Sequence, residues 1–259
     1  MPAPTNRFKQ ALKDGQTQIG CWAAFADAYA TEMMGTTGFD WLVIDGEHAP
    51  NDLQTLSQQI QVLQHTQSEA VVRLPVGNEW LIKQVLDAGC QTILVPLVET
   101  ADQATHLVRA MRYPPQGIRG MGGGGARATG FSGIPDYVTT ANDQVCLLVQ
   151  VETAKGMDNL DDILKVEGVD GVFIGPADLS ADMGHPGNPT HPDVAKAIRN
   201  GLGKIAASSK AAGILAFKDE IAQDYLKWGA QFLAVGMDVV LLVKTARALS
   251  AKWHDRLKR

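Results

Sequence analysis

Residues 145–152 have the sequence VCLLVQVE, an apolar run that ends with the polar side chains Gln150 and Glu152. Apolar residues follow one another here without alternation, which is typical of a parallel strand covered on both faces. Seven more runs of this kind recur along the chain, separated by longer stretches. They are IGCWAAF from Ile19, WLVID from Trp41, AVVRLP from Ala70, TILVPLVE from Thr92, GVFIG from Gly171, GILAF from Gly213 and FLAVG from Phe232.

The stretches between these runs carry helix signals. One helix is expected to begin at Asn51 and end near Gln64, and another to begin at Asn78 and end at Gly89. Eight strands that alternate with helices predict a single-domain (β/α)8 TIM barrel over residues 1–259. An open doubly wound sheet is the alternative. It needs fewer strands and usually a glycine-rich phosphate turn after the first strand, where this chain has AAFADAYA.

Composition excludes several classes of protein. The chain is 45% hydrophobic and 20% charged with a net charge of -5, which indicates a soluble domain without a basic face for nucleic acid. Apolar runs fall short of the roughly 18 residues that span a membrane, and MPAPTNRFKQ lacks the core of a signal peptide, so a cytoplasmic location is expected. The odd number of cysteines, Cys21, Cys90 and Cys146, predicts buried free thiols.

A long segment between the fourth and fifth strands, residues 113–142, breaks the pattern. It contains YPPQGIRGMGGGGARATGFSGIPDY and is predicted to be an irregular loop over the catalytic face. Its glycines do not fit the GxxxxGK[ST] phosphate loop, so a flexible loop that approaches the substrate closely is the favoured interpretation.

Ionisable and polar groups stand where four predicted strands end. Barrel enzymes build their active sites from the carboxyl ends of the strands, so these groups are expected to converge on one pocket. They are Asp45 and His48, Arg73, Gln150 and Glu152, and Asp178 in GPAD.

Glu152 and Asp178 form the sharpest pair in this set. Two carboxylates without a nearby cysteine or histidine ligand favour a hard divalent ion such as Mg²⁺ or Mn²⁺ over Zn²⁺. Two protein ligands leave positions free for a 2-oxo acid, whose carbonyl the ion could polarise. The alternative is a pair of carboxylates that cap loop amides.

Arg73 and His48 are the candidates for charge stabilisation and proton transfer. A guanidinium at the end of an apolar strand can stabilise a developing enolate oxygen, although a structural ion pair with Asp45 or Glu47 would also explain Arg73. An imidazole near neutral pKa suits proton transfer, and His48 could equally be an exposed loop residue. Asp87 has no distinguishing sequence signal.

Long motifs in this chain resemble the metal-dependent, class II pyruvate aldolases of the HpcH/HpaI family. They are WLVIDGEHAPND, VVRLPVGNE, TILVPLVET, RYPPQGIRG, LLVQVET and GVFIGPADLS, and they extend over nearly the whole chain. The resemblance implies a divalent metal, Mg²⁺, Mn²⁺ or Co²⁺, on Glu152 and Asp178. It also implies that Gln150, Ala177, Arg73 and the backbone around Gly175 and Pro176 hold pyruvate. It makes His48 the proton acceptor, Asp87 the acid that raises its basicity and Arg73 the transition-state stabiliser, with Asp45 beside them.

The implied reaction cleaves 4-hydroxy-2-oxo acids such as 4-hydroxy-2-oxoheptanedioate, in aromatic catabolism, to pyruvate and an aldehyde through an enolate held by the metal. The resemblance also implies a homohexamer, a trimer of dimers, in which the last helix, within VVLLVKTARALSAKWHDRLKR, is exchanged between subunits. Two departures, the glycines at residues 122–125 and the bulky Phe217, suggest a different aldehyde preference.

Four other functions stay open at this stage. One is an aldolase of the same family for 2-dehydro-3-deoxy sugar acids. A Schiff-base aldolase needs a desolvated lysine, and Lys155 and Lys218 lie beyond the strand ends. A CoA-ester lyase of the citrate lyase type needs an adenine and phosphate site, which the sequence does not reveal. A non-catalytic sensor of oxo acids would bind pyruvate without turnover.

Overall fold

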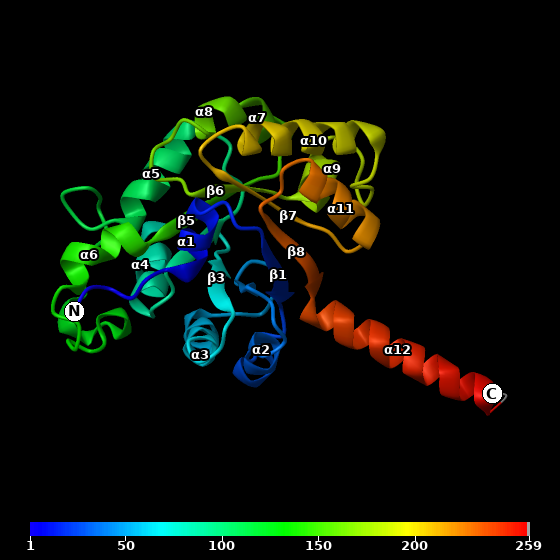
Figure 1. The fold of residues 1–259 in the computed structure, drawn as a ribbon, viewed down its shortest axis with the longest axis horizontal. Coiled ribbons are helices and arrows are strands. Elements are labelled where there is room, and N and C mark those ends of the chain that lie inside the picture. The colour runs from blue at the N-terminus through cyan, green and yellow to red at the C-terminus, as the bar shows by residue number, and fades with distance from the viewer. Residues whose placement is uncertain (258–259) are drawn as a thin grey trace.

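Eight parallel strands close into a barrel in the order β1 to β8. Figure 1 shows the chain as a computed structural model, in which residues 1–257 are described. All eight predicted strands are present, so the barrel prediction is confirmed. The strands are β1 (Gln18–Ala23), β2 (Trp41–Asp45), β3 (Glu69–Arg73), β4 (Thr92–Val95), β5 (Cys146–Val151), β6 (Gly171–Ile174), β7 (Ala211–Leu215) and β8 (Phe232–Met237).

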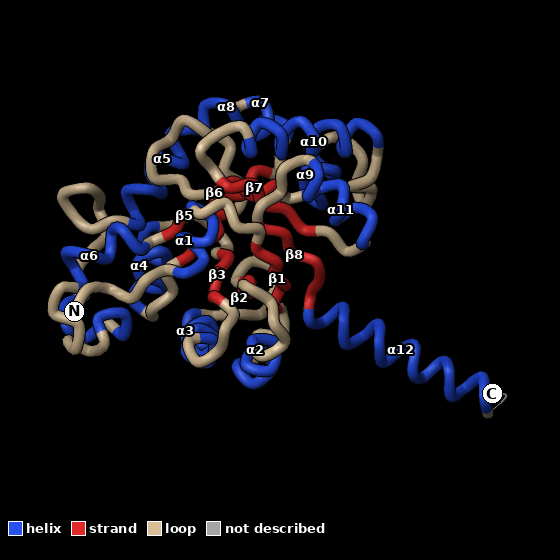
Figure 2. Tube along the Cα trace, viewed as in Figure 1, coloured by secondary structure: helices blue, strands red, loops and turns tan. Residues whose placement is uncertain are grey.

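The chain also forms helices, most of which surround the barrel on its outer side (Figure 2). They are α1 (Arg7–Lys13), α2 (Ala28–Gly35), α3 (Leu53–Leu63), α4 (Glu79–Asp87), α5 (Ala101–Met111), α6 (Tyr137–Gln144), α7 (Ala154–Asp158), α8 (Leu160–Ile163), α9 (Pro176–Asp182), α10 (Pro192–Ala206), α11 (Asp219–Lys227) and α12 (Asp238–Arg256).

Helix starts follow the polar residues in the sequence, with one correction. Asn78 caps α4 by accepting a hydrogen bond from the Trp80 amide at 3.0 Å, as predicted. Helix α3 begins one residue later than expected, because the Asp52 carboxylate caps it through the Thr55 amide at 2.8 Å. The Asn51 side chain instead donates to the Asp45 carbonyl at 2.8 Å and so fastens the loop to the end of β2.

Large aromatic rings fill the amino-terminal half of the barrel. Trp41 and Phe232 point inward from β2 and β8, and Phe8 of α1 enters from below, with ring centroids 5.8 to 5.9 Å apart. Gly20 and Gly213 make room for them, because a Cβ at either position would collide with Trp41 or Phe232, respectively. The barrel is therefore a packed core at this end.

A second apolar layer lies between the strands and the helices. The strand residues that alternate with the inward ones, such as Leu42, Val72 and Leu147, pack there against the helices. The three cysteines are free and buried, as the sequence predicted. Burial raises the pKa of Cys21 and Cys90 to about 12, so these thiols stay protonated at neutral pH.

The long segment that starts at residue 113 does not lie where the sequence predicted. It follows helix α5, not strand β4, and it ends in helix α6. Its Arg127 donates to the Ala88 carbonyl at 2.9 Å, just beyond the end of α4. Because helices run antiparallel to the strands in this fold, the segment packs near the amino-terminal end of the barrel and leaves the catalytic face open.

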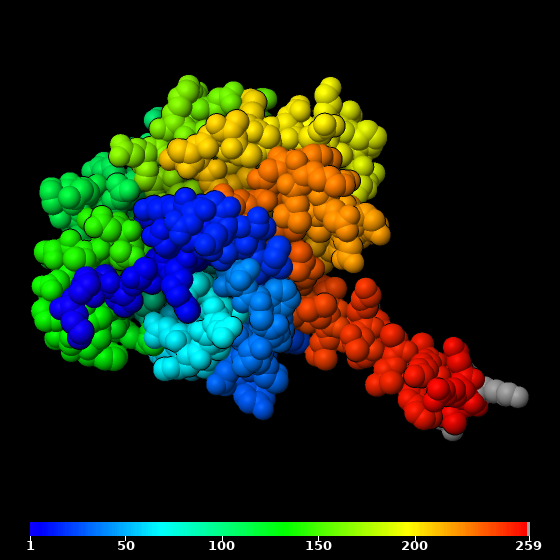
Figure 3. All heavy atoms as spheres, viewed as in Figure 1, coloured from blue at the N-terminus to red at the C-terminus, as the bar shows by residue number. Residues whose placement is uncertain are grey.

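Helix α12 projects away from the barrel (Figures 1 and 3). It carries a series of apolar side chains that remain 36 to 58% exposed. They are Val240, Leu241, Leu242, Val243, Leu249 and Trp253. Within residues 1–257, none of the helices combines the length and apolar character needed to cross a membrane.

Candidate active site

Polar residues occupy the inward positions at the carboxyl ends of β2, β3 and β5, above the apolar residues that fill the amino-terminal half of the barrel. Side chains alternate along a strand, so Trp41 and Val43 on the inner face of β2 are followed by Asp45. Likewise, Leu148 on β5 is followed by Gln150, and Glu152 continues that face. The strand period therefore sends these polar groups into the barrel mouth.

Arg73, at the end of β3, is 7% exposed and makes a two-pronged ion pair. Its Nε and Nη2 donate to Asp45 Oδ1 and Oδ2 at 2.9 and 2.7 Å. Burial alone would raise the pKa of Asp45, but the hydrogen bonds and charge of Arg73 lower it below its ordinary value. Arg73 Nη1 also lies 2.9 Å from Glu47 Oε2. The structural ion pair considered for Arg73 is thus present and leaves the guanidinium fixed at the barrel mouth.

Glu152 is a buried carboxylate with few compensating partners. Its Oε1 accepts from the Leu97 amide at 2.9 Å, and its Oε2 accepts from the Gln150 side chain. Burial raises its pKa to about 7, with smaller contributions from the negative charges of Asp178 and Glu47. A positive ion beside it would remove much of the cost of keeping this group ionised.

The turn between β6 and α9 forms the adjacent wall of the site. Gly175 follows the strand and precedes α9, Pro176 is the first helical residue, and Ala177 and Asp178 follow in the first turn of α9. Gly175 lies against Glu152, because an added Cβ would collide with Glu152 Oε2 and stand 2.8 Å from Glu152 Cβ. This close approach brings the Asp178 charge near enough to affect the pKa of Glu152.

The donor set fits a hard divalent cation. Glu152, Asp178 and Glu47 all supply carboxylate oxygens, and the neighbouring Gln150 supplies an amide oxygen. One of these buried atoms, Gln150 Oε1, has no hydrogen-bond partner, whereas Glu47 Oε2 faces the Arg73 guanidinium at 2.9 Å. Buried oxygens normally find a partner, so a cation or a ligand donor in this space would satisfy Gln150 Oε1.

The chain does not bring His48 and Asp87 together. The His48 side chain is 65% exposed on the loop after β2, and its Nε2 lies 3.7 Å from Glu47 Oε2. Asp87 is the last residue of α4, near the opposite end of the barrel, where it pairs with Arg119 at 2.6 Å. A pair between His48 and Asp87 would therefore require Asp87 from another copy of the chain.

The two departures noted in the sequence lie in different places. Phe217, just beyond β7, is 57% exposed at the carboxyl end of the barrel. The glycines at residues 122–125 lie with the long segment, and Gly122 stands beside Asp87. They do not line the mouth of their own barrel.

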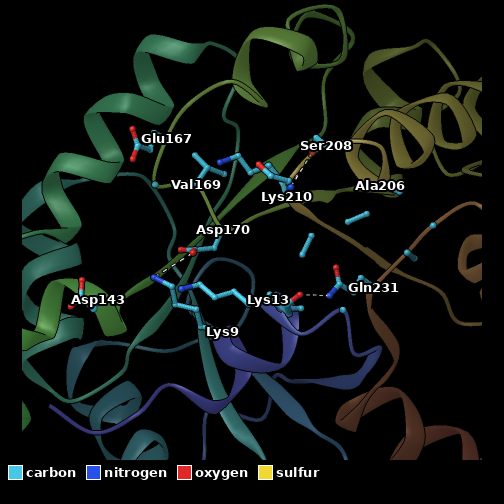
Figure 4. A pocket seen from close by; sticks show the side chains of 18 of the residues that line it. Lys9, Lys13, Asp143, Glu167, Val169, Asp170, Ala206, Ser208, Lys210 and Gln231 are labelled. Carbon is cyan, nitrogen blue, oxygen red and sulfur yellow. Dashed lines mark hydrogen bonds and ion pairs between the residues drawn. The ribbon is translucent and has the colours of Figure 1, made fainter. Parts of the chain in front are cut away.

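A cavity of about 1000 Å³ opens at the amino-terminal end of the barrel, as Figure 4 shows. Lys9 of α1 lies beside Asp170 at 3.3 Å, and Lys210 stands at the start of β7. Active sites of this fold lie at the other end of the strands, so the carboxyl-terminal group is the candidate catalytic site.

Glu47 is a site residue that sequence reasoning treated only as an ion-pair partner of Arg73. It lies between Arg73 and His48, and burial raises its pKa, with the charge of Asp178 among the lesser causes. Its place two residues after the inward Asp45 is the sequence signal that could have identified it.

Comparisons with known proteins agree on one family. The model of the HpcH/HpaI aldolase/citrate lyase family matches residues 18–245. A hydroxypyruvate/pyruvate aldolase from Roseovarius nubinhibens is 62% identical, covering 98% of this chain and 99% of that protein. A 4-hydroxy-2-oxo-heptane-1,7-dioate aldolase from Escherichia coli is 54% identical, covering 96% of this chain and 95% of that protein. The crystal structure of a family protein from Burkholderia cenocepacia has a TM-score of 0.93 at 40% identity, and the match covers 96% of this chain and 100% of that protein.

Proposed function

The chain belongs to the HpcH/HpaI aldolase/citrate lyase family and is a carbon–carbon lyase of the aldolase type, and we propose that it is a divalent-metal-dependent aldolase for 2-oxo acids. The observation that carries this proposal is the buried Glu152 carboxylate beside Asp178, with the unpartnered amide oxygen of Gln150 next to it. Glu152 and Asp178 would hold the ion. When bound, the ion would polarise the keto oxygen of the substrate and offset its developing negative charge.

The remaining groups have roles that follow from their places. Gln150 orients Glu152 through its amide, and the first turn of α9 would offer the backbone N–H groups of Ala177 and Asp178 to the carboxylate of the oxo acid. In the cleavage direction, His48 would accept the proton of the C4 hydroxyl. The C3–C4 bond then breaks, its electron pair passes to the oxo acid as an enolate, and an aldehyde leaves. Arg73, held by Asp45, would face the enolate oxygen.

Two oxo acids are proposed as the partner of the aldehyde. Pyruvate follows from the resemblance in the motifs and from the 54% identical heptanedioate aldolase. Hydroxypyruvate enters because the 62% identical relative is named for both compounds. A panel of aldehydes assayed with each oxo acid identifies the preferred pair.

The decisive experiment measures condensation of an aldehyde with pyruvate after chelation, and again with Mg²⁺, Mn²⁺ or Co²⁺ added. We expect activity to disappear with chelator and to return with metal. Glu152→Gln should remain inactive, whereas Glu32→Gln, on the exposed face of α2, should behave as wild type. Full turnover in excess EDTA would overturn the metal requirement. Exchange of the pyruvate methyl protons in D₂O separates an enzyme from a sensor, and borohydride trapping separates it from a Schiff-base aldolase.

We also propose that a second copy of the chain covers α12, within the homohexamer implied by the resemblance. The exposed apolar side chains of this helix are unusual for a helix in water, and an exchanged helix would bury them. Sedimentation velocity should give a hexamer for the wild type. Leu242→Glu and Leu249→Glu should together reduce its mass, and a monomeric wild type would contradict the proposal.

A further inference from the structure

A second group of metal-ligating side chains lies outside the barrel mouth, at the connection from α9 to α10. His185, His191 and Asp193 each offer a ligand atom, and these atoms lie within 4.8 Å of one another. Within residues 1–257 no other three His, Cys, Asp or Glu side chains converge this closely. We propose that these three side chains bind a transition-metal ion such as Zn²⁺, Ni²⁺ or Cu²⁺.

The two imidazoles direct nitrogens toward the same carboxylate. Their rings stack with centroids 3.5 Å apart and an interplanar angle of 13°. Asp193 Oδ2 is 3.8 Å from His185 Nε2 and 3.7 Å from His191 Nδ1. Two ligands of a tetrahedral zinc ion lie about 3.3 Å apart, so the carboxylate oxygen and the two nitrogens need to approach by about 0.4 to 0.5 Å. An imidazole binds an ion in its ring plane, so one of the stacked rings must also turn about its side-chain torsions to share the ion.

The loop holds these side chains in place before any ion binds. The Asn188 amide donates to the His185 carbonyl, and the His191 amide donates to the Asn188 carbonyl, each at 3.0 Å. Gly184 and Gly187 adopt φ angles of +83° and +72°, which other residues rarely adopt. Because two successive turns bring the histidines together, the backbone of the loop has little conformational entropy left to lose on binding.

The nitrogen atoms available for coordination follow from the hydrogen bonds. His191 Nδ1 accepts a weak hydrogen bond of 3.3 Å from the Asp193 amide, so its lone pair points toward Asp193. The His185 and His191 side chains are 28% and 31% exposed, which leaves an ion access from solvent. Coordination would replace one long hydrogen bond with a metal–nitrogen bond.

Ligand chemistry separates this site from the barrel mouth. Two imidazoles and a carboxylate favour Zn²⁺, Ni²⁺ and Cu²⁺, whereas a site of oxygen atoms favours Mg²⁺ and Mn²⁺. The His185 amide also donates to the Ser180 carbonyl of α9 at 2.7 Å. A bound ion would therefore join the end of α9, whose first turn carries Asp178, to the start of α10.

Equilibrium dialysis of the untagged protein against Ni²⁺ tests the site. We expect His185→Ala and His191→Ala each to bind one ion per chain fewer than the wild type. His65→Ala, an exposed histidine elsewhere, should bind as many as the wild type. Asp178→Asn should retain the ion at the histidine cluster. Loss of metal at the barrel mouth can therefore be distinguished from loss of metal at the histidine cluster. Equal binding by the wild type and both cluster variants, with unchanged circular dichroism, would overturn the proposal.

Electron paramagnetic resonance gives a signature that a merely structural role for these residues would not produce. With excess Mg²⁺ and one equivalent of Cu²⁺, the wild type should show coupling to two imidazole nitrogens. His191→Ala should lose one of these couplings, and His65→Ala should keep both. A wild-type spectrum from oxygen ligands alone would exclude the site.

Discussion

The two ends of the barrel are built from the same strands but from opposite chemistries. At the amino-terminal end, Phe8, Trp41 and Phe232 fill the interior with rings. At the carboxyl end, Asp45, Arg73, Gln150 and Glu152 occupy inward positions and leave one buried oxygen of the site, Oε1 of Gln150, without a partner. The amino-terminal end is fully packed in the folded chain. The carboxyl end holds polar groups whose hydrogen bonding a substrate or ion could complete.

This difference means that the amino-terminal half of the barrel contributes mainly to folding stability and the carboxyl end mainly to chemistry. The rings gain free energy by leaving water, so their contribution is already complete in the folded chain. The buried polar groups cost free energy until they are paired. Substitutions at the amino-terminal end should therefore change unfolding, and substitutions at the carboxyl end should change binding and turnover.

Phe232→Ala should have the largest effect on stability. Removing this buried ring leaves a cavity beside Phe8 and Trp41 and should lower the free energy of unfolding by about 3–5 kcal/mol. Urea denaturation measures the loss, and turnover below the melting temperature should stay close to that of the wild type. Phe131→Ala, at a ring that is 71% exposed, is the matched control. Equal stability of the two variants would contradict the packed-end description.

Arg73→Ala should mainly affect turnover. Loss of one preorganised group that stabilises negative charge typically lowers kcat by about 100- to 1000-fold. KM should change much less, and Arg73→Lys should recover only part of the rate because lysine cannot form the two-pronged pair with Asp45. Steady-state kinetics decide this, with thermal melting to check folding. An unchanged kcat in Arg73→Ala would remove the guanidinium from the mechanism.

Gly175→Ala tests the wall of the proposed metal site. The added methyl group would displace the Glu152 carboxylate, and we expect metal affinity to fall by about 10- to 100-fold. Gly203→Ala in α10 is the control, because no atom lies within 4 Å of the added Cβ. Calorimetric titration with Mn²⁺ compares the two. Wild-type affinity in Gly175→Ala would show that Glu152 does not hold the ion.

The pH dependence of Mg²⁺ binding should give the smallest effect. Since burial raises the pKa of Glu152 to about 7, an ion must displace a proton at pH 6 but not at pH 8. Affinity should be about tenfold lower at pH 6. In the metal-free protein, folding stability changes with pH in the opposite direction to metal affinity. Glu152 should favour the folded state increasingly as pH falls from about 7 toward its ordinary value of 4.5. Calorimetry in two buffers detects the proton, and its absence would contradict the raised pKa.

The barrel was predictable because each strand has a recognisable pattern in its own short stretch of sequence. Runs such as VCLLVQVE show burial on both faces, and eight of them leave few alternatives. The long segment was misplaced because its helix α6 carries a weak apolar pattern, and because sequence alone does not show that α5 intervenes before it. The start of α3 was off by one residue because Asn51 and Asp52 are both good helix caps, and tertiary contact with Asp45 engaged the first.

The site residues that directly follow a predicted strand could be placed from the sequence. Asp45, Arg73, Gln150 and Glu152 follow buried runs, so the fold rule brings them together. Glu47 was undervalued because its burial depends on Arg73, a contact between different strands. The separation of His48 from Asp87 could have been foreseen from the barrel, because Asp87 ends a helix that runs antiparallel to the strands, but the resemblance that pairs the two residues carries no positions.

The ring cluster has a consequence for how this chain folds during synthesis. Phe8 leaves the ribosome long before its partner Phe232, which belongs to the final strand of the barrel. Contacts between such distant residues form late, since a long loop must close first. A nascent chain that stops before β8 would leave Phe8 and Trp41 facing water, so shortened translation products should be prone to aggregate and to engage chaperones.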